Sequence, residues 1–179
     1  MNKLKGNSLV REFLIYIPNS FLVEFSGCTR SSALSNHDCV NAIDGNMGPY
    51  GWWATNLPIW GIFELTDEEK MNSLVLMNGK SATGNTYGYL IIFKVTLKVD
   101  GQWIQLSDLQ VKEDPTAQIT NDGTVTLNSA ISNLTLEFTT LTNVQSIRLD
   151  VTNTEDATPK NLWIREIIPG FNGTFKNTF

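Results

Sequence analysis

Residues 44–54 read DGNMGPYGWWA and place three large aromatic side chains, Tyr50, Trp52 and Trp53, among turn-forming residues. Three glycines and a proline interrupt both helix and central strand in this segment, so we expect a loop. An aromatic ring on a loop offers a flat apolar face to a ligand. We therefore expect Tyr50 and Trp52 to contact a ligand, the alternative being a loop folded back onto the core. Trp53 is expected mainly to pack.

A second candidate loop covers residues 79–88, GKSATGNTYG, between two expected strands. It is polar and rich in glycine. Lys80, Asn85 and Tyr87 would supply hydrogen-bond donors and a second stacking surface. The alternative is an ordinary surface loop. The segment lacks the leading glycine of a phosphate-binding loop, so nucleotide binding is not expected.

Residues 153–161, NTEDATPKN, form a third loop before the last expected strand. Lys160 and Asp156 are its candidate ligand-binding residues, and a solvated turn is the alternative. His37 is the only histidine and has no partnered nucleophile in the sequence, so it either caps a turn or touches a ligand. The sequence contains neither a zinc-protease nor a serine-hydrolase motif, and we expect no enzyme activity.

The two cysteines, Cys28 and Cys39, are separated by 11 positions. They are close enough to pair if the chain turns between them, and two reduced cysteines are the other interpretation. With a single histidine they cannot supply the four ligands of an ordinary zinc site.

Composition narrows the class of partner. The chain of 179 residues has a net charge of −5 and 17% charged residues, which indicates one globular domain without the basic stripe that nucleic acid requires. The acidic balance also disfavours anionic membranes, and no apolar run reaches the roughly 18 residues of a membrane span. No classical signal peptide is evident. We expect synthesis in the cytoplasm and a function on a virion surface or outside the cell.

Strand patterns dominate the chain, and no long segment has helical periodicity. Asp67, Glu68 and Glu69 are expected to form a turn, and Asp100-Gly101 predicts a hairpin. The expected strands cover residues 13–17, 21–25, 59–65, 72–79, 89–99, 102–106, 134–138, 145–152 and 162–168. So many short strands with turn residues between them predict an all-β antiparallel sandwich or barrel.

Several blocks occur in the order found in one known family. They are SS (31–32), AIDGN (42–46), WWAT (52–55), PIWGIFEL (58–65), VTLKVDGQW (95–103), VQSIRLDV (144–151) and LWIREIIPG (162–170). In these blocks the chain resembles the discoidin domain, also called the coagulation factor V/VIII type C domain, a galactose-binding-like jelly roll. The resemblance implies an antiparallel jelly-roll β-sandwich of about eight core strands over residues 26–170. Residues 1–25 would be an N-terminal strand extension and 171–179 a C-terminal tail.

The chain departs from the family at several positions. No cysteine follows Cys39, so the disulfide that joins the two ends of secreted animal members is missing. Thr66 replaces a glycine, and the segment from Asp44 to Trp53 is longer than usual.

The resemblance also implies ligand loops at one end of the sandwich and, in many relatives, a structural Ca²⁺ ion. Asp44, Asn46 and Glu166 would hold that ion, with backbone carbonyls completing the oxygen shell. Alternatively, Asp44 caps its own turn and Glu166 pairs with an arginine.

Together these features predict a non-catalytic module that recognises carbohydrate or a glycan-bearing cell surface. The alternative is a phage-like structural, decoration or tail-associated protein of a virion that docks on neighbouring virion proteins through its terminal segments. Membrane lipid binding is the weaker alternative. The sequence leaves the oligomeric state open.

Overall fold

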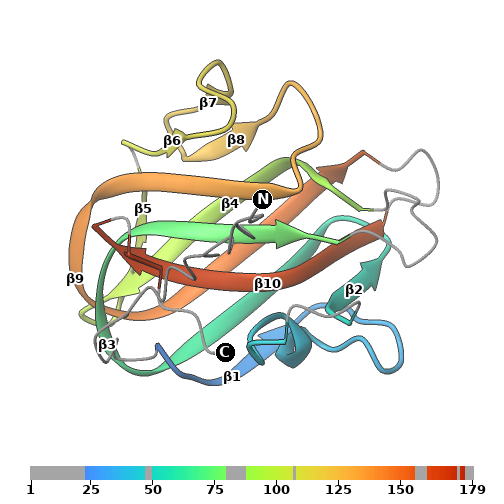
Figure 1. Cartoon of the computed structure of the whole chain (residues 1–179), viewed down its shortest axis with the longest axis horizontal. Coiled ribbons are helices and arrows are strands. Elements are labelled where there is room, and N and C mark those ends of the chain that lie inside the picture. Colours follow the sequence, from blue (N-terminus) through green and yellow to red (C-terminus); the bar gives the residue numbers. More distant parts are fainter. Residues whose placement is uncertain are drawn as a thin grey trace, which may run out of the picture.

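The computed structural model of the chain describes residues 23–46, 50–79, 88–106, 108–155, 161–172 and 174–175. These residues form an antiparallel β-sandwich of the jelly-roll type, which confirms the expected fold class (Figure 1). The expected strand at 13–17 and residues 21–22 of the next lie outside the described residues, and of residues 23–25 only Phe25 belongs to a strand. The division into an extension, a sandwich and a tail stays a prediction.

The elements, in chain order, are one short 3₁₀ helix and eleven strands among the described residues. They are β1 (Phe25–Arg30), η1 (Cys39–Ala42), β2 (Trp52–Thr55), β3 (Ile59–Asn78), β4 (Leu90–Val99), β5 (Gln102–Gln105), β6 (Gln110–Val111), β7 (Gln118–Ile119), β8 (Thr124–Thr126), β9 (Asn133–Thr154), β10 (Asn161–Phe171) and β11 (Thr174–Phe175). No helix among these described residues has the length and hydropathy needed to cross a bilayer.

Two long strands, β3 and β9, link the layers of the sandwich (Figure 1). The first part of β3 pairs with β1 and with the second part of β9, whereas the second part of β3 pairs with β10 and with the first part of β9. The pairing register shifts between Glu64 and Ser73. Such irregularities bend a strand, and this bend carries the chain from one layer to the other.

This bend corrects three expectations. The turn expected at 67–69 is a bent part of β3, and the strands expected at 134–138 and 145–152 are two parts of β9. Three consecutive acidic residues resemble a turn in sequence, but here they belong to a continuous strand, in which Asp67 and Glu68 are exposed and Glu69 is half-buried. β10 also continues past 168, since Pro169 and Gly170 still pair with β3.

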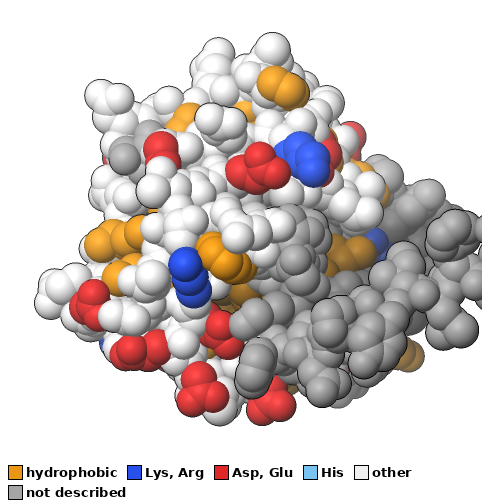
Figure 2. Space-filling view, turned by 60° about the vertical axis from the view of Figure 1, so that its left-hand side comes forward, with side chains coloured by type: hydrophobic (Ala, Val, Ile, Leu, Met, Phe, Trp, Pro, Cys, Tyr) orange, Lys and Arg blue, Asp and Glu red, His pale blue; other side chains and the backbone are white. Residues whose placement is uncertain are grey.

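Alternating residues of the long strands fill the space between the layers. Val95 and Leu97 of β4 are fully buried, as are Ile147 and Leu149 of β9. The largest fully buried side chains are those of Trp52, Phe63 and Phe93. The same alternation directs polar residues outward. On the face shown in Figure 2, acidic side chains and small hydrophobic areas lie scattered among uncharged groups.

Candidate functional site

The segment that contains the two adjacent tryptophans is a strand rather than a loop. Trp52 and Trp53 belong to β2, which pairs with the beginning of β10. The turn-forming residues end at Gly51, where a Cβ atom would collide with the backbone of Ile164. Gly51 therefore allows β2 to approach β10 closely, and the strand begins with the next residue.

Because successive side chains of a strand point to opposite faces, the two indoles have different surroundings. The Trp52 side chain is 0% exposed, lies edge-on to Phe63 at 5.8 Å between ring centroids and donates its Nε1–H to the Ser32 carbonyl at 2.9 Å. It offers no surface to a ligand. The expected ligand contact of Trp52 is therefore wrong, and its ring is part of the core.

Trp53 points the other way and joins three further rings. It stacks on Trp163 of β10, with ring centroids 5.2 Å apart and planes inclined by 4°. The His37 ring lies edge-on to both, with centroid distances of 5.3 Å to Trp53 and 6.1 Å to Trp163. Tyr50 lies 6.1 Å from His37 and is 59% exposed. We call His37, Tyr50, Trp53 and Trp163 the aromatic cluster.

Backbone hydrogen bonds hold the His37 segment against β2. Trp53 N–H donates to the His37 carbonyl at 3.1 Å, and Leu34 N–H donates to the Trp53 carbonyl at 2.8 Å. His37 N–H closes the turn by donating to the Leu34 carbonyl at 3.0 Å. Trp53 of β2 and Trp163 of β10 lie directly opposite each other in the pairing of these two strands. The strand pairing therefore brings their two rings together.

Nitrogen atoms of the aromatic cluster have no hydrogen-bond partner. His37 Nδ1, Trp53 Nε1 and Trp163 Nε1 are buried and unpaired. An unpaired buried polar atom costs stability, so it identifies a place where a polar ligand group would be stabilising. Two large apolar side chains, Leu34 and Val40, are also exposed, and they lie before and after His37 in the sequence.

Five of the predicted ligand-binding residues lie outside the described residues, namely Lys80, Asn85, Tyr87, Asp156 and Lys160. The described ends of their loops nevertheless lie at the aromatic cluster. Gly79 N–H donates to the Trp163 carbonyl at 2.7 Å, and Trp163 N–H donates to the Gly88 carbonyl at 3.3 Å. Both ends of the 79–88 loop thus lie next to Trp163, and the 153–161 loop ends two residues before it.

Two predicted metal ligands come together beside the 44–50 segment. Glu166 is 5% exposed, its Oε2 atom has no hydrogen-bond partner, and its pKa is raised to about 7. Burial is the larger cause and the nearby Asp44 carboxylate the second, while a hydrogen bond from Gly45 N–H opposes them. Asp44 is exposed, and its Oδ1 accepts the Asn46 N–H at 2.8 Å. Asp44 thus does cap its own turn, as the alternative expectation stated.

Asn46 contributes this backbone donor to the turn, and its side chain is exposed. The alternative partner for Glu166, an arginine, is not supported at Arg165, whose Nε donates to the Asn78 carbonyl at 3.1 Å.

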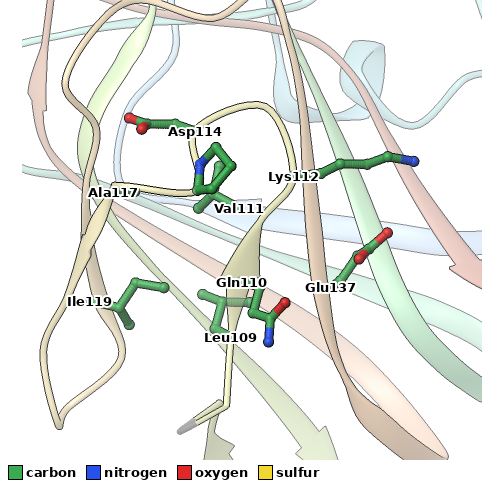
Figure 3. Close-up of a pocket in the computed structure, with 9 residues that line it drawn as sticks. Leu109, Gln110, Val111, Lys112, Asp114, Ala117, Ile119 and Glu137 are labelled. Atoms are coloured by element: carbon green, nitrogen blue, oxygen red, sulfur yellow. The ribbon is translucent and has the colours of Figure 1, made fainter.

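Two hollows lie elsewhere on the described surface. One, of about 500 Å³, lies where the β6–β7 segment folds over, with Leu109, Val111 and Ile119 facing its interior (Figure 3). The other, of about 390 Å³, lies beside β5. Neither is lined by an aromatic ring, so neither offers the stacking surface that the aromatic cluster has.

Sequence reasoning missed most of this cluster. Of the four residues, the sequence predicts only Tyr50 as a ligand contact. Trp53 is expected mainly to pack, Trp163 lies in an expected strand, and His37 is expected either to cap a turn or to touch a ligand. The signal was present in the alternation of LWIREII, which directs Trp163 away from the face of Leu162 and Ile164.

Several solved structures with a similar fold are carbohydrate-binding modules. One is a pectin-binding carbohydrate-binding module with 21% sequence identity and a TM-score of 0.60, covering 85% of this chain and 94% of that one. The fold is that of a carbohydrate-binding module. A second is the family 32 module of NanJ from C. perfringens in complex with galactose, with 14% identity, a TM-score of 0.59 and coverage of 79% and 90%.

A third is the CBM32 of AlyQ in complex with 4,5-unsaturated mannuronic acid, with 17% identity, a TM-score of 0.57 and coverage of 84% and 98%. No protein-family model and no curated protein sequence matches the chain. These likenesses show the jelly-roll fold alone.

Proposed function

We propose that the chain is a non-catalytic carbohydrate-binding module and that the aromatic cluster binds a sugar ring. The observation that carries this proposal is the combination of an exposed Tyr50 ring with unpaired nitrogen atoms on His37, Trp53 and Trp163 behind it. The fold likeness supports the same class of function. Because the proposal concerns binding alone, it requires no nucleophile or acid–base pair.

The chemistry of a sugar matches these groups. The Tyr50 ring presents an apolar face that the C–H face of a sugar covers, which removes both surfaces from water. Sugar hydroxyls are both donors and acceptors, so they can pair with an imidazole nitrogen and with indole N–H groups. The partly exposed rings of His37 and Trp53 lie between Tyr50 and the covered Trp163.

Asp44 and Glu166 would hold a Ca²⁺ ion beneath this surface. Their fit rests on the unpaired Oε2 of buried Glu166 and on the neighbouring Asp44 carboxylate, two hard oxygen donors whose mutual repulsion a cation would relieve. A bound cation would supply charge neutralisation.

The test is binding to a panel of glycans that includes galactose, pectin and chitosan, followed by titration of the Tyr50→Ala variant. We expect this variant to lose affinity at least tenfold with an unchanged melting temperature, because an exposed ring contributes little to the fold. Trp103→Ala is the matched control, since Trp103 is 42% exposed on β5, which lies toward the opposite end of the sandwich from β2 (Figure 1). Equal binding by wild type and Tyr50→Ala would remove the aromatic cluster from the ligand site.

A further inference from the structure

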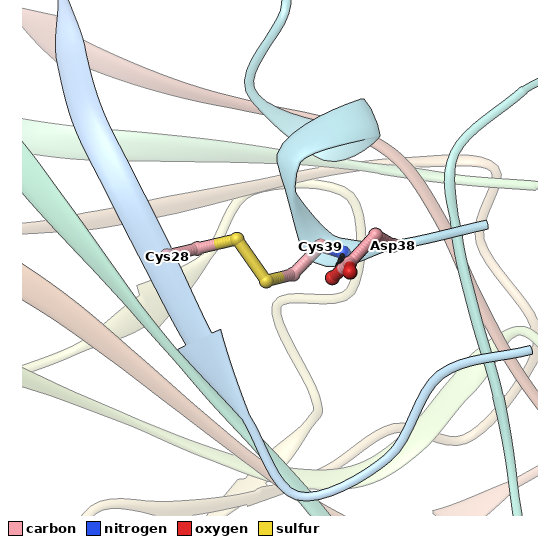
Figure 4. A group of neighbouring side chains, drawn as sticks. All are labelled: Cys28, Asp38 and Cys39. Atoms are coloured by element: carbon pink, nitrogen blue, oxygen red, sulfur yellow. Dashed lines mark hydrogen bonds between the residues drawn. A yellow bond between two sulfur atoms is a disulfide. The ribbon is translucent and has the colours of Figure 1, made fainter. Parts of the chain in front are cut away.

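A disulfide lies next to the aromatic cluster. The sequence left the state of the two cysteines open, and in the structure they are paired, Cys28 on β1 with Cys39 at the start of η1 (Figure 4). Their Cα atoms lie 6.1 Å apart. The bond closes a loop over residues 28–39, and His37 lies within this loop, two residues before Cys39.

An ion pair forms a second tether in the same place. Arg30 Nε and Nη2 donate to the two carboxylate oxygens of Asp38, each at 2.6 Å. Asp38 Oδ1 also accepts the Cys39 N–H at 2.6 Å, which caps η1. The Arg30 hydrogen bond is the main cause that lowers the pKa of Asp38. One covalent and one ionic link therefore join β1 to Asp38 and Cys39, the two residues that directly follow the His37 turn.

The segment between these links is also hydrogen-bonded to the sandwich, because Ser31 N–H donates to the Trp60 carbonyl and the Ser32 carbonyl accepts the Trp52 Nε1–H. Ser31, Leu34, Ser35 and Asn36 are exposed, whereas Cys39 and Ala42 are buried in the core. The position of the His37 ring over Trp53 thus depends on the backbone hydrogen bonds that join the Leu34–His37 turn to Trp53, and on the two tethers that hold Asp38 and Cys39 directly after His37.

We propose that the Cys28–Cys39 disulfide is a redox-sensitive lock on the aromatic cluster. The oxidised form holds His37 against Trp53, and reduction loosens the His37 turn and weakens ligand binding while the sandwich stays folded. This inference rests on the proposed sugar site for its effect on binding, but its effect on the His37–Trp53 contact is independent of any ligand.

The reductive step is thiol–disulfide exchange with a dithiol such as dithiothreitol. Its thiolate attacks the Cys28 sulfur, the S–S bond breaks, and the Cys39 thiolate leaves and takes up a proton. The second thiol of the reagent then displaces the protein from the mixed disulfide, which yields the Cys28 thiol and oxidised reagent. Cys28 is the partly exposed member of the pair and Cys39 is 1% exposed, so attack at Cys28 is favoured.

Reduction must be carried out with a chelator. One carboxylate oxygen of Asp38 and both cysteine sulfurs lie within 4.8 Å of one another (Figure 4). Once reduced, the three groups could hold a thiophilic cation, which would tether the loop again. EDTA removes this complication, and a parallel sample with Zn²⁺ shows whether a cation restores the oxidised geometry.

The experiment compares oxidised, reduced and reoxidised full-length chain by NMR of ¹⁵N-labelled tryptophan and by titration with galactose as the probe sugar. We expect reduction to abolish the nuclear Overhauser contact between the His37 ring and Trp53 and to lower galactose affinity at least tenfold. Both effects should reverse on reoxidation. The Trp103 indole resonance is the internal control, because Trp103 lies on β5, away from the 28–39 loop, and should not shift.

The outcomes separate this inference from the proposed function. An unchanged His37–Trp53 contact in the reduced form overturns the lock, as does an unchanged affinity in a protein that binds galactose when oxidised. A lost contact with no galactose binding in either form supports the lock and counts against galactose as the ligand. If Cys28→Ser with Cys39→Ser fails to fold, chemical reduction of the folded wild type still decides the question.

Discussion

The buried carboxyl group of Glu166 makes the stability of the metal-free protein depend on pH in an unusual direction. Its pKa rises from 4.5 to about 7 on folding. The folded chain therefore holds this proton more tightly than the unfolded chain, and between these pH values the folded state loses stability as pH rises. Well below pH 4.5 Glu166 is protonated in both the folded and the unfolded chain, and burial of its charge then costs the folded state nothing.

The size of the effect follows from the same shift. One pKa unit corresponds to about 1.4 kcal/mol, so the shift from 4.5 to about 7 in a group that is 5% exposed would contribute a penalty of about 3 kcal/mol at pH 8. Glu166→Gln removes the charge. In EDTA this variant should match wild type near pH 4.5 and exceed it by that amount at pH 8.

Urea unfolding followed by tryptophan fluorescence, from pH 4.5 to 8.5, measures this difference. Groups with a lowered pKa, such as Asp38 beside Arg30, lose their stabilising contribution at acid pH in both proteins and cancel in the comparison. Glu24→Gln, at an exposed glutamate, is the matched control and should show no such trend. A difference between wild type and Glu166→Gln that stays flat across this range would refute the burial argument.

Calcium then reverses the order of the two proteins. If Asp44 and Glu166 hold Ca²⁺, millimolar Ca²⁺ at pH 8 should stabilise wild type by mass action and leave Glu166→Gln unchanged. Ca²⁺ that stabilises neither protein would contradict the metal proposal while the pH profile could still hold.

Two further predictions concern packing beneath the aromatic cluster. Trp52→Ala should lower the free energy of unfolding by about 3 to 5 kcal/mol, because it empties a fully buried site, whereas Trp103→Ala should change it little; urea denaturation checks both. Gly79→Ala places a Cβ against the Trp163 ring and should lower stability by about 1 to 3 kcal/mol. Galactose titration should show weaker binding by Gly79→Ala but not by Gly27→Ala, since a Cβ at Gly27 meets nothing within 4 Å; equal affinities would show that Trp163 is not held by Gly79.

Period-two alternation carried most of the fold information in the sequence. The Phe93, Val95 and Leu97 series, like the Ile147, Leu149 and Val151 series, is apolar on one face only, and all six side chains are buried. What alternation could not reveal was the continuity of β3 and β9. A strand that bends between layers exposes several consecutive residues, and in sequence such a segment is indistinguishable from a turn.

The candidate site was harder to predict, because its residues depend on pairing between distant parts of the chain. Two adjacent tryptophans in a strand must face opposite sides, but nothing local says which one faces the core. The pairing of Trp53 with Trp163 and the packing of Trp52 on Phe63 settle that question through β10 and β3. The two cysteines pose the same kind of problem, since a separation of 11 positions permits both a disulfide and two thiols.

The placement of the four rings also explains how one small surface can be both stable and able to bind. Trp163 is 6% exposed and packed between Gly79 and Trp53, so it belongs to the scaffold, whereas Tyr50 is 59% exposed and presents its ring to a ligand. His37 connects the two, because its ring touches Tyr50 on one side and the indole pair on the other. A ligand that stacks on Tyr50 would therefore be connected through His37 to the packed Trp53 and Trp163 rings. Any change that displaces His37 would remove this contact between Tyr50 and the two indoles.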